Sequence, residues 1–380
     1  MQELPIRKDR ALVPVSYSAP IVLRRTFLTS LLATPLLRAA PELRWLPIPN
    51  AGLEIDGLPW FAQNDGEFFR LPAASKDKFP APVWNLAKSP SGGRIRLRTD
   101  STALAVRLEY PSPPSMNNMH AFGQTGVDLY SDGAYRGTAI ADKDAQPGKV
   151  YEHVYFSGAP RAWHEATLYL SLYKPVKVIS VGIDSEARLE KARSFAVASP
   201  VVYYGTSITQ GGCASRPGMS YQAILGRLLN IDFVNLGFSG NGKGEPEVAE
   251  AVSQIDASCF VLDFAQNNGT VASLREVYGP FLDRLRKAHP ETPILAITPI
   301  FSTREASGAS QNEGMREHIR QVVSQRIGAG DRNLQVVEGT DLLGPSRSDG
   351  LVDGTHPNDL GFQWMAEGLA PRLRRVLAIS

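Results

Sequence analysis

The stretch Val201-Val202-Tyr203-Tyr204-Gly205-Thr206-Ser207 joins an apolar run of strand length to a tight turn that ends on a serine. After it, apolar runs of similar length alternate with segments of helical period up to the end of the chain. This alternation predicts a doubly wound parallel sheet with helices on both faces. The predicted strands are Val201–Tyr204, Phe233–Leu236, Phe260–Phe264, Ile294–Thr298 and Leu334–Val337, and the predicted helices lie around Ser220–Leu229, Pro246–Gln254, Ser273–His289, Asn312–Ile327 and Leu360–Leu377.

The chain before residue 200 has another pattern, in which short stretches alternate between polar and apolar residues. Turn sequences such as Ser91-Gly92-Gly93 and Ser131-Asp132-Gly133 separate these stretches. Many short strands at this spacing predict an antiparallel β-sandwich. The predicted strands are Gly93–Thr99, Ala103–Tyr110, Gly126–Tyr130, Ala166–Leu170 and Val176–Ile183.

The length of 380 residues predicts two domains, because one hydrophobic core usually serves roughly 100–200 residues. The change of pattern places a sandwich domain at 45–195 and an α/β domain at 196–380, after a leader of residues 1–41. In the leader, Arg24-Arg25 precedes a short apolar stretch from Leu28 to Leu37, which is followed by Arg38-Ala39-Ala40-Pro41. These features predict a twin-arginine export signal and a periplasmic or extracellular location. The alternative is a leader that is apolar by chance.

The composition is that of a soluble globular protein, with 43% hydrophobic and 21% charged residues. No apolar run approaches the ~20 residues of a membrane span, so we expect no stable membrane anchor. The net charge of +2, without a concentrated basic face, argues against nucleic acid as a partner. Cys213 and Cys259 are too few for a disulfide framework or a metal site, but they could form one bridge if the fold brings them together. His120, His153 and His164 are too scattered to suggest a metal site.

Two motifs carry the residues of a possible hydrolytic site. Ser207 follows a predicted strand on a tight turn, where its hydroxyl could act as a nucleophile or simply cap the next helix. The second motif is Asp353-Gly354-Thr355-His356-Pro357, just before the last predicted helix. His356 could donate from Nδ1 to Asp353 within one loop, which would leave Nε2 to accept the serine proton. The alternative is a loop histidine beside a capping aspartate.

Two further segments at strand ends could bind an oxyanion. Gly237-Phe238-Ser239-Gly240-Asn241-Gly242 follows the second predicted strand, and its glycines would let a backbone N–H face a ligand. Ala265-Gln266-Asn267-Asn268 follows the third, and an asparagine side chain there could donate to a developing alkoxide. Each could instead be an ordinary turn. Ligands of open α/β sheets bind outside the carboxyl ends of the strands, where both of these segments and Ser207 fall.

With these blocks the chain resembles the SGNH (GDSL-like) hydrolase superfamily. The matching residues are Gly205-Thr206-Ser207, Gly240, Asn267 and Asp353-Gly354-Thr355-His356. The segment Gly126-Val127-Asp128-Leu129-Tyr130 is similar to the Gly-x-Asp-Leu-Tyr motif of a bacterial subgroup with an N-terminal β-sandwich. The resemblance implies a flavodoxin-like hydrolase domain after that sandwich, and an oxyanion hole made by the Ser207 and Gly240 backbone N–H groups and the Asn267 side chain.

Three departures from known hydrolase motifs involve four positions. Thr206 replaces the aspartate of the usual Gly-Asp-Ser, which puts any role of that carboxylate in doubt. Ala265 and Asn268 replace the glycine and aspartate that usually flank the family's asparagine block. Thr209 occupies the last position of a Gly-x-Ser-x-Gly motif, which argues against an ordinary α/β-hydrolase.

These observations predict a serine ester hydrolase that removes short acyl groups, such as acetyl, from a carbohydrate or small-molecule ester. His356 would act as base and then acid, oriented by Asp353, and the mechanism requires no cofactor and no metal ion. The alternatives are an acyltransferase with the same site and an inactive glycan-binding protein. Trp60, Trp84 and Trp163 could form a sugar-stacking face or belong to a core. The sequence predicts no oligomeric state.

Overall fold

The computed structural model describes residues 41–141, 144–308 and 310–380. The predicted export signal around Arg24 and Arg25 lies outside these residues. The apolar run at Val201 forms one strand of a five-stranded parallel sheet. Its strands are β11 (Val201–Gly205), β12 (Phe233–Gly237), β13 (Cys259–Asp263), β14 (Ile294–Ile297) and β15 (Leu334–Val337), in the order β12-β11-β13-β14-β15.

Counted along the chain, this order is 2-1-3-4-5, which is the order of flavodoxin-like sheets. The predicted doubly wound α/β fold is therefore confirmed. The direction of strand crossing reverses at β11, between β12 and β13. The loops after these three strands consequently meet at one edge of the sheet, where ligands of such folds bind.

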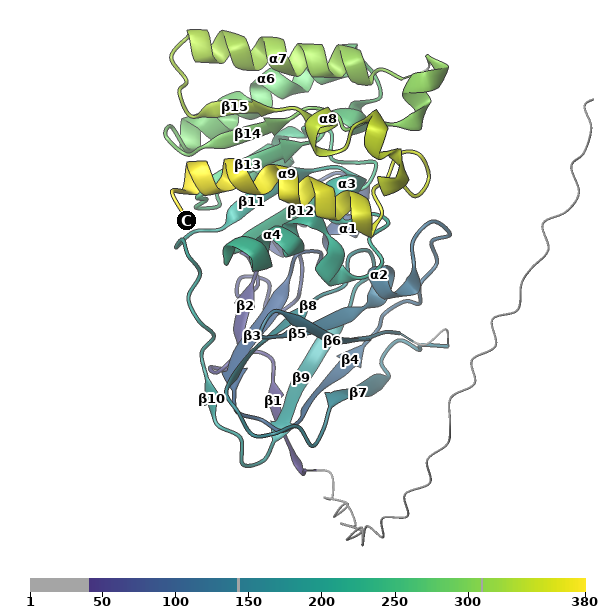
Figure 1. Cartoon of the computed structure of the whole chain (residues 1–380), viewed down its shortest axis with the longest axis vertical. Coiled ribbons are helices and arrows are strands. Elements are labelled where there is room, and N and C mark those ends of the chain that lie inside the picture. Colours follow the sequence, from purple (N-terminus) through teal and green to yellow (C-terminus); the bar gives the residue numbers. More distant parts are fainter. Residues whose placement is uncertain (1–40, 142–143, 309) are drawn as a thin grey trace, which may run out of the picture. The chain divides into compact units, whose positions relative to one another are not determined.

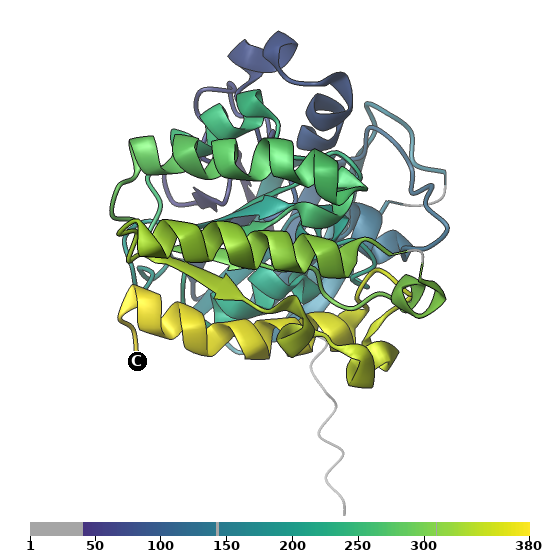
Figure 2. The ribbon, with the colours of Figure 1, turned by 90° about the horizontal axis from the view of Figure 1, so that it is seen from above.

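The two faces of the sheet bury alternate residues of the same strand, since successive strand side chains point in opposite directions. Val202 and Tyr204 belong to one buried cluster, and Val201 and Tyr203 belong to the other. Helices α5 (Pro246–Ser253), α6 (Val271–Ala288) and α7 (Asn312–Gly328) cover the first face, and α4 (Tyr221–Leu229) and α9 (Asp359–Leu377) cover the second. Figure 1 shows α4 and α9 in front of the sheet, and Figure 2 shows α6, α7 and α9 with nearly aligned axes.

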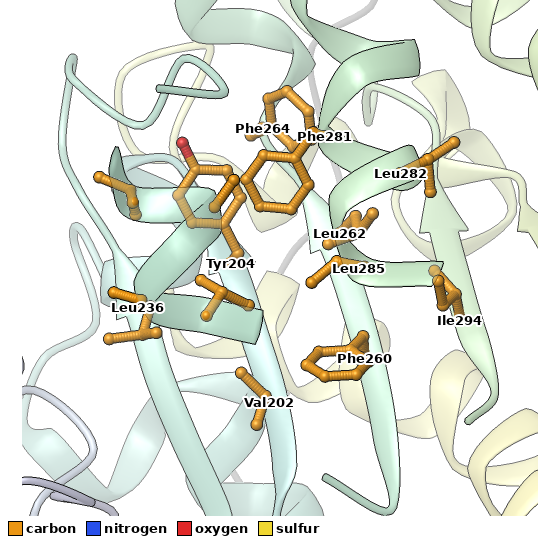
Figure 3. Packing of buried hydrophobic residues seen from close by; sticks show 14 of the residues in the cluster. Val202, Tyr204, Leu236, Phe260, Leu262, Phe264, Phe281, Leu282, Leu285 and Ile294 are labelled. Carbon is orange, nitrogen blue, oxygen red and sulfur yellow. The ribbon is translucent and has the colours of Figure 1, made fainter. Parts of the chain in front are cut away.

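Aromatic rings fill the first face near the carboxyl ends of the strands (Figure 3). The ring of Tyr204 on β11 stacks on Phe281 of α6 with centroids 4.6 Å apart. Phe264, directly after β13, lies 5.1 Å from the same Phe281 ring. Such ring pairs contribute about 0.5–1.5 kcal/mol each beyond the burial of their area. This packing gives the site loops a rigid base at the carboxyl ends of the strands.

The N-terminal part of the described chain forms two antiparallel sheets, so the predicted β-sandwich is confirmed. One sheet has the order β1-β9-β4-β7, and the other has the order β10-β3-β8-β5-β6, with β2 paired to β3. Leu46, Val106 and Leu168 are among the side chains of both sheets that share one buried cluster. The strands are β1 (Leu43–Pro47), β2 (Glu54–Asp56), β3 (Arg94–Thr99), β4 (Leu104–Glu109), β5 (Val127–Ser131), β6 (Ala134–Ala139), β7 (Val150–Phe156), β8 (His164–Tyr169), β9 (Lys177–Asp184) and β10 (Leu189–Glu190).

The described ranges also contain five short 3₁₀ helices and four short α-helices: α1 (Ala81–Ala87), α2 (Ala121–Thr125), α3 (Ser207–Gln210) and α8 (Gly339–Leu342). None of the helices in the described ranges has both the length and the hydrophobicity that crossing a membrane requires. The leader aside, residues 40–380 form one compact unit.

Buried arginines join the N-terminal part to the parallel sheet. The Arg70 side chain is fully buried, and its Nη1 donates to the backbone carbonyls of Asn235 (3.1 Å) and Gly237 (2.6 Å) on β12. Arg94 donates to the Phe233 carbonyl at 3.1 Å and pairs with Asp232. Because β12 is an edge strand of the sheet, these guanidinium groups satisfy carbonyls that would otherwise lack a neighbouring strand.

Candidate active site

Ser207 is the first residue of α3, directly after β11. The residue that caps this helix is Thr206, whose side chain accepts a hydrogen bond from the Ile208 N–H at 3.2 Å. The interpretation of Ser207 as a capping residue is therefore wrong, and its hydroxyl is available for another partner. Gly205 makes the turn possible, because a Cβ there would lie 2.0 Å from Thr209 Oγ1.

The three residues of the predicted triad lie together. Ser207 Oγ is 2.8 Å from His356 Nε2, and His356 Nδ1 is 2.8 Å from Asp353 Oδ2. Asp353 Oδ1 also accepts from the His356 backbone N–H at 2.9 Å. Burial raises the pKa of Asp353, but the hydrogen bonds from His356 and from Asn118 outweigh it and hold that pKa well below its usual range. The carboxylate therefore stays charged beside the imidazole.

The loop that carries His356 is fixed by hydrogen bonds from a neighbouring turn to one of its backbone carbonyls. The Gly354 carbonyl accepts from the Thr303 N–H and from Ser302 Oγ, each at 2.9 Å. Gly354 has a φ of +80°, in the left-handed region that favours glycine. Val352 N–H donates to the His356 carbonyl at 2.8 Å, which closes the loop. These contacts fix the loop that positions the imidazole.

The two predicted oxyanion segments are tied to each other and to β11. Phe238 N–H donates to the Gly205 carbonyl at 2.9 Å, and Asn267 Nδ2 donates to the Phe238 carbonyl at 3.1 Å. An amide NH2 has two donors, so one N–H of Asn267 is left after this bond. No acceptor within the described ranges bonds to the backbone N–H of Ser207 or of Gly240. The Ser207 N–H, the Gly240 N–H and one side-chain N–H of Asn267 are thus three donors without an acceptor among the described residues.

Sequence reasoning missed two contacts from the N-terminal part. Asn118 Nδ2 donates to Asp353 Oδ2 at 3.1 Å, and Tyr173 Oη donates to the Ser207 carbonyl at 3.3 Å. Asn118 lies in a segment without a recognisable motif. Tyr173, by contrast, ends the stretch Thr167–Tyr173, which is similar to the same subgroup's sequence pattern as the Gly-x-Asp-Leu-Tyr motif, and this resemblance was the one available signal.

The Gly-x-Asp-Leu-Tyr residues reach the segment that follows α3. Asp128 is fully buried and accepts from Arg216 Nη1 at 2.9 Å and from the Gly218 N–H at 2.8 Å. Arg216 Nη1 also donates to Tyr130 Oη at 2.7 Å. Burial raises the pKa of Asp128, although these hydrogen bonds oppose the shift. The motif therefore holds residues 216–218 against the sandwich.

The cysteines do not pair: both Cys213 and Cys259 are free and buried. Cys213, Asp353 and His356 place one potential metal-ligand atom each within 4.8 Å of one another, and no other such group occurs in the described part of the chain. Burial, followed by the charge of Asp353, raises the pKa of the Cys213 thiol to about 12. A neutral, buried thiol is a poor nucleophile, so Ser207 is the better candidate.

The tryptophans do not share a face. Trp60 is buried in the cluster on the first face of the parallel sheet, and Trp84 packs against that cluster. Trp163 lies under the guanidinium groups of Arg98 and Arg188. These positions fit roles in packing better than a common sugar-stacking surface.

Comparisons with known proteins agree with this architecture. The model of the GDSL-like lipase/acylhydrolase family matches residues 198–374. The model for the N-terminus of SGNH-hydrolase-type esterases, labelled GxDLY, matches residues 43–189. No curated protein sequence matches the chain.

Among solved structures, a protein of Bacteroides ovatus ATCC 8483 described as a GDSL-like lipase is 33% identical, with 89% of this chain and 99% of that chain covered and a TM-score of 0.78. The salicylyl-acyltransferase SsfX3 from a tetracycline biosynthetic pathway is 24% identical, with 88% and 97% covered and a TM-score of 0.73. A family two carbohydrate esterase from Clostridium thermocellum, in complex with cellohexaose, is 18% identical, with 76% and 93% covered and a TM-score of 0.59. The last two likenesses concern the fold alone.

Proposed function

Because the chain belongs to the GDSL-like lipase/acylhydrolase family and is an esterase of that family, we propose that Ser207 forms an acyl-enzyme with its ester substrate. The observation that carries this proposal is the continuous hydrogen-bonded chain from Ser207 through His356 to Asp353. With a proton on Nδ1 held by the carboxylate, Nε2 accepts the serine proton as Oγ attacks the ester carbonyl.

The tetrahedral intermediate places negative charge on the former carbonyl oxygen. We assign its stabilisation to the Ser207 and Gly240 backbone N–H groups and to the second N–H of Asn267. His356 then protonates the leaving alcohol, and a water molecule attacks the acyl-enzyme with the same imidazole as base. Every proton in this cycle moves through His356.

The substrate proposed is a carbohydrate or small-molecule ester with a short acyl group such as acetyl. A carbohydrate alcohol is supported by the fold shared with carbohydrate esterases of family two, one of which is in complex with cellohexaose. Transfer of the acyl group to another hydroxyl is the second candidate function, supported by the fold shared with a salicylyl-acyltransferase. Product analysis with and without added alcohols distinguishes the two.

Replacement of Ser207 by alanine tests the mechanism. Wild-type protein should hydrolyse phenyl acetate, and Ser207→Ala should lose about 10⁴-fold or more in kcat, because loss of a triad nucleophile removes the covalent route. A fluorophosphonate should label wild type at Ser207 and leave the variant unlabelled. Ser253→Ala, at a partly exposed serine that ends α5, is the matched control. Turnover that survives in Ser207→Ala would refute the mechanism and leave a glycan-binding role as the remaining candidate.

Export is proposed from the leader sequence. Arg24→Lys together with Arg25→Lys should leave the precursor in the cytoplasm. Normal export of that double variant would refute the twin-arginine assignment.

A further inference from the structure

A pocket of about 200 Å³ opens beside the proposed catalytic residues. Three of its lining residues, Ile208, Gln266 and Thr355, each adjoin in sequence one residue of the proposed site. They come from the turn after β11, the turn after β13 and the loop before α9. Their convergence from three loops places the pocket next to the ester that Ser207 would attack.

The wall of the pocket includes four apolar side chains. Ile208, Ile300 and Met315 are buried, and Phe301 is partly exposed at the same wall. An apolar cavity of about 150 Å³ is sufficient to hold a benzene ring. The pocket therefore has room for a six-membered ring, which is far more than the methyl group of an acetyl ester needs.

One of the residues that line this pocket is a cation. Arg304 lines it, is exposed, and forms no ion pair with any residue in the described ranges. The adjacent acid, Glu305, does not neutralise it. Glu305 instead accepts from Arg316 at 2.7 and 2.9 Å and from Asn312 at 3.0 Å.

The turn that carries Arg304 is itself firmly held. Ser302 and Glu305 form a capping box around residues 303–307. The Arg316 side chain of α7, only 3% exposed, also donates to the Pro299 carbonyl at 2.9 Å and to the Ile300 carbonyl at 3.0 Å. Arg304 thus lies on a firmly held turn and lines a pocket whose wall is partly apolar.

We propose that this pocket selects esters in which one substituent is a six-membered ring bearing a carboxylate, with the ring against Ile300 and Met315 and the carboxylate on Arg304. A planar guanidinium matches a carboxylate with two parallel hydrogen bonds. The proposal rests on the proposed esterase function and names its substrate class. The ring is supplied by the acyl group, as in an aromatic acid, or by the alcohol, as in a uronic acid.

Two series of esters separate these sources. In the alcohol series, 4-carboxyphenyl acetate is compared with 4-(methoxycarbonyl)phenyl acetate, whose ring is the same but uncharged at that position. In the acyl series, the 4-nitrophenyl ester of 4-carboxybenzoic acid is compared with that of its monomethyl ester. In one of the two series, wild-type protein should favour the carboxylate in kcat/KM by about fivefold or more, as expected for a charge-assisted pair at a partly exposed position.

Arg304→Ala should abolish this preference, mainly through a higher KM, and 0.5 M NaCl should weaken it in wild type. Arg332→Ala is the matched control, because Arg332 is also exposed and precedes β15 at the opposite edge of the sheet. It should keep the preference. Gln311→Trp, at an exposed lining residue, should lower kcat/KM on the ring ester severalfold relative to vinyl acetate.

The absence of a preference for the carboxylate in both series, or a preference that survives Arg304→Ala, would overturn the proposal. If Gln311→Trp leaves the ratio of kcat/KM on the ring ester to kcat/KM on vinyl acetate unchanged, the ring does not bind in this pocket, and the proposal is overturned as well. Either result leaves the esterase function standing as long as phenyl acetate is hydrolysed and Ser207→Ala is inactive. Failure of phenyl acetate hydrolysis in wild type would instead count against the proposed function itself.

Discussion

Asn118 and Asp353 are 235 positions apart in the chain, yet Asn118 Nδ2 donates to Asp353 Oδ2 at 3.1 Å. The acceptor is the same oxygen that lies 2.8 Å from His356 Nδ1. A segment of the N-terminal part thus reaches the carboxylate that orients the proposed base. The sandwich part supplies neither the nucleophile nor the base of the proposed mechanism, but it contributes a positioning residue.

Asn118→Ala should lower kcat by about three- to tenfold at an unchanged KM, since one hydrogen bond to a charged group is lost. The hydrogen bond also helps to hold the pKa of Asp353 low, so the variant should show a pH–rate profile altered on its acidic side. Asn117→Ala is the control, because Asn117 is exposed next to it and forms no hydrogen bond with the described residues. Equal kinetics and pH profiles in the two variants would remove Asn118 from the site.

Asn267→Ala should reduce kcat by about 10²–10³-fold with little change in KM, as does the loss of an oxyanion donor. Its hydrogen bond to Phe238 also predicts a loss of about 1 kcal/mol in the free energy of unfolding. Asn268→Ala is a close control, because Asn268 Nδ2 donates to the Phe264 carbonyl at 3.2 Å. That variant should lose similar stability and keep kcat. A full kcat in Asn267→Ala would show that the asparagine only supports the loop.

Asp128→Ala should lower the free energy of unfolding by about 3–5 kcal/mol, the usual cost of removing one partner of a buried ion pair. The variant leaves Arg216 Nη1 and the Gly218 N–H without their buried acceptor. Urea titration measures the change. Asp77→Ala, at an exposed aspartate, should alter stability by less than about 0.5 kcal/mol. A similarly small change in Asp128→Ala would contradict the anchoring role of the motif.

The burial of Asp263 predicts that the folded protein becomes less stable as pH rises. It is almost fully buried at the end of β13, accepts from Thr209 Oγ1 at 3.3 Å, and burial raises its pKa from 3.8 to about 7. Between about pH 4 and 7 the unfolded chain releases this proton while the folded chain keeps it, so folding loses stability over that window.

Asp263→Asn should remove this penalty. The free energy of unfolding of the variant, relative to that of wild type, should increase by up to about 4 kcal/mol between pH 4 and 7. Above pH 7 the difference should stay constant. Urea unfolding at pH 4.5 and 8 measures it. In Asp77→Asn the difference from wild type should be the same at both values. A pH-independent difference in Asp263→Asn would mean that the carboxyl is ionised in the folded protein throughout this range.

Much of the fold follows from local patterns. Apolar runs such as Leu334–Val337 coincide with their strands, and the helix predicted from Asn312 ends within one residue of its observed end at Gly328. The strands that were missed were β1, β6, β7 and β10, which lie at the ends of their sheets, and β2, which pairs only with β3. Edge strands have one neighbour and more exposed side chains, so their hydrophobic pattern is weaker.

The sequence by itself determined which residues end the central strands, and the order of the parallel strands then forces those ends to one edge of the sheet. Ser207 and Asn267 follow β11 and β13, which are neighbours, so their convergence is encoded in local pattern and topology together. Only the tertiary structure decided which groups support them. The hydrogen bonds from Asn118 to Asp353 and from Arg70 to β12 join segments that are far apart in the chain. No local sequence pattern predicts them, because they arise only when one part of the chain packs on another.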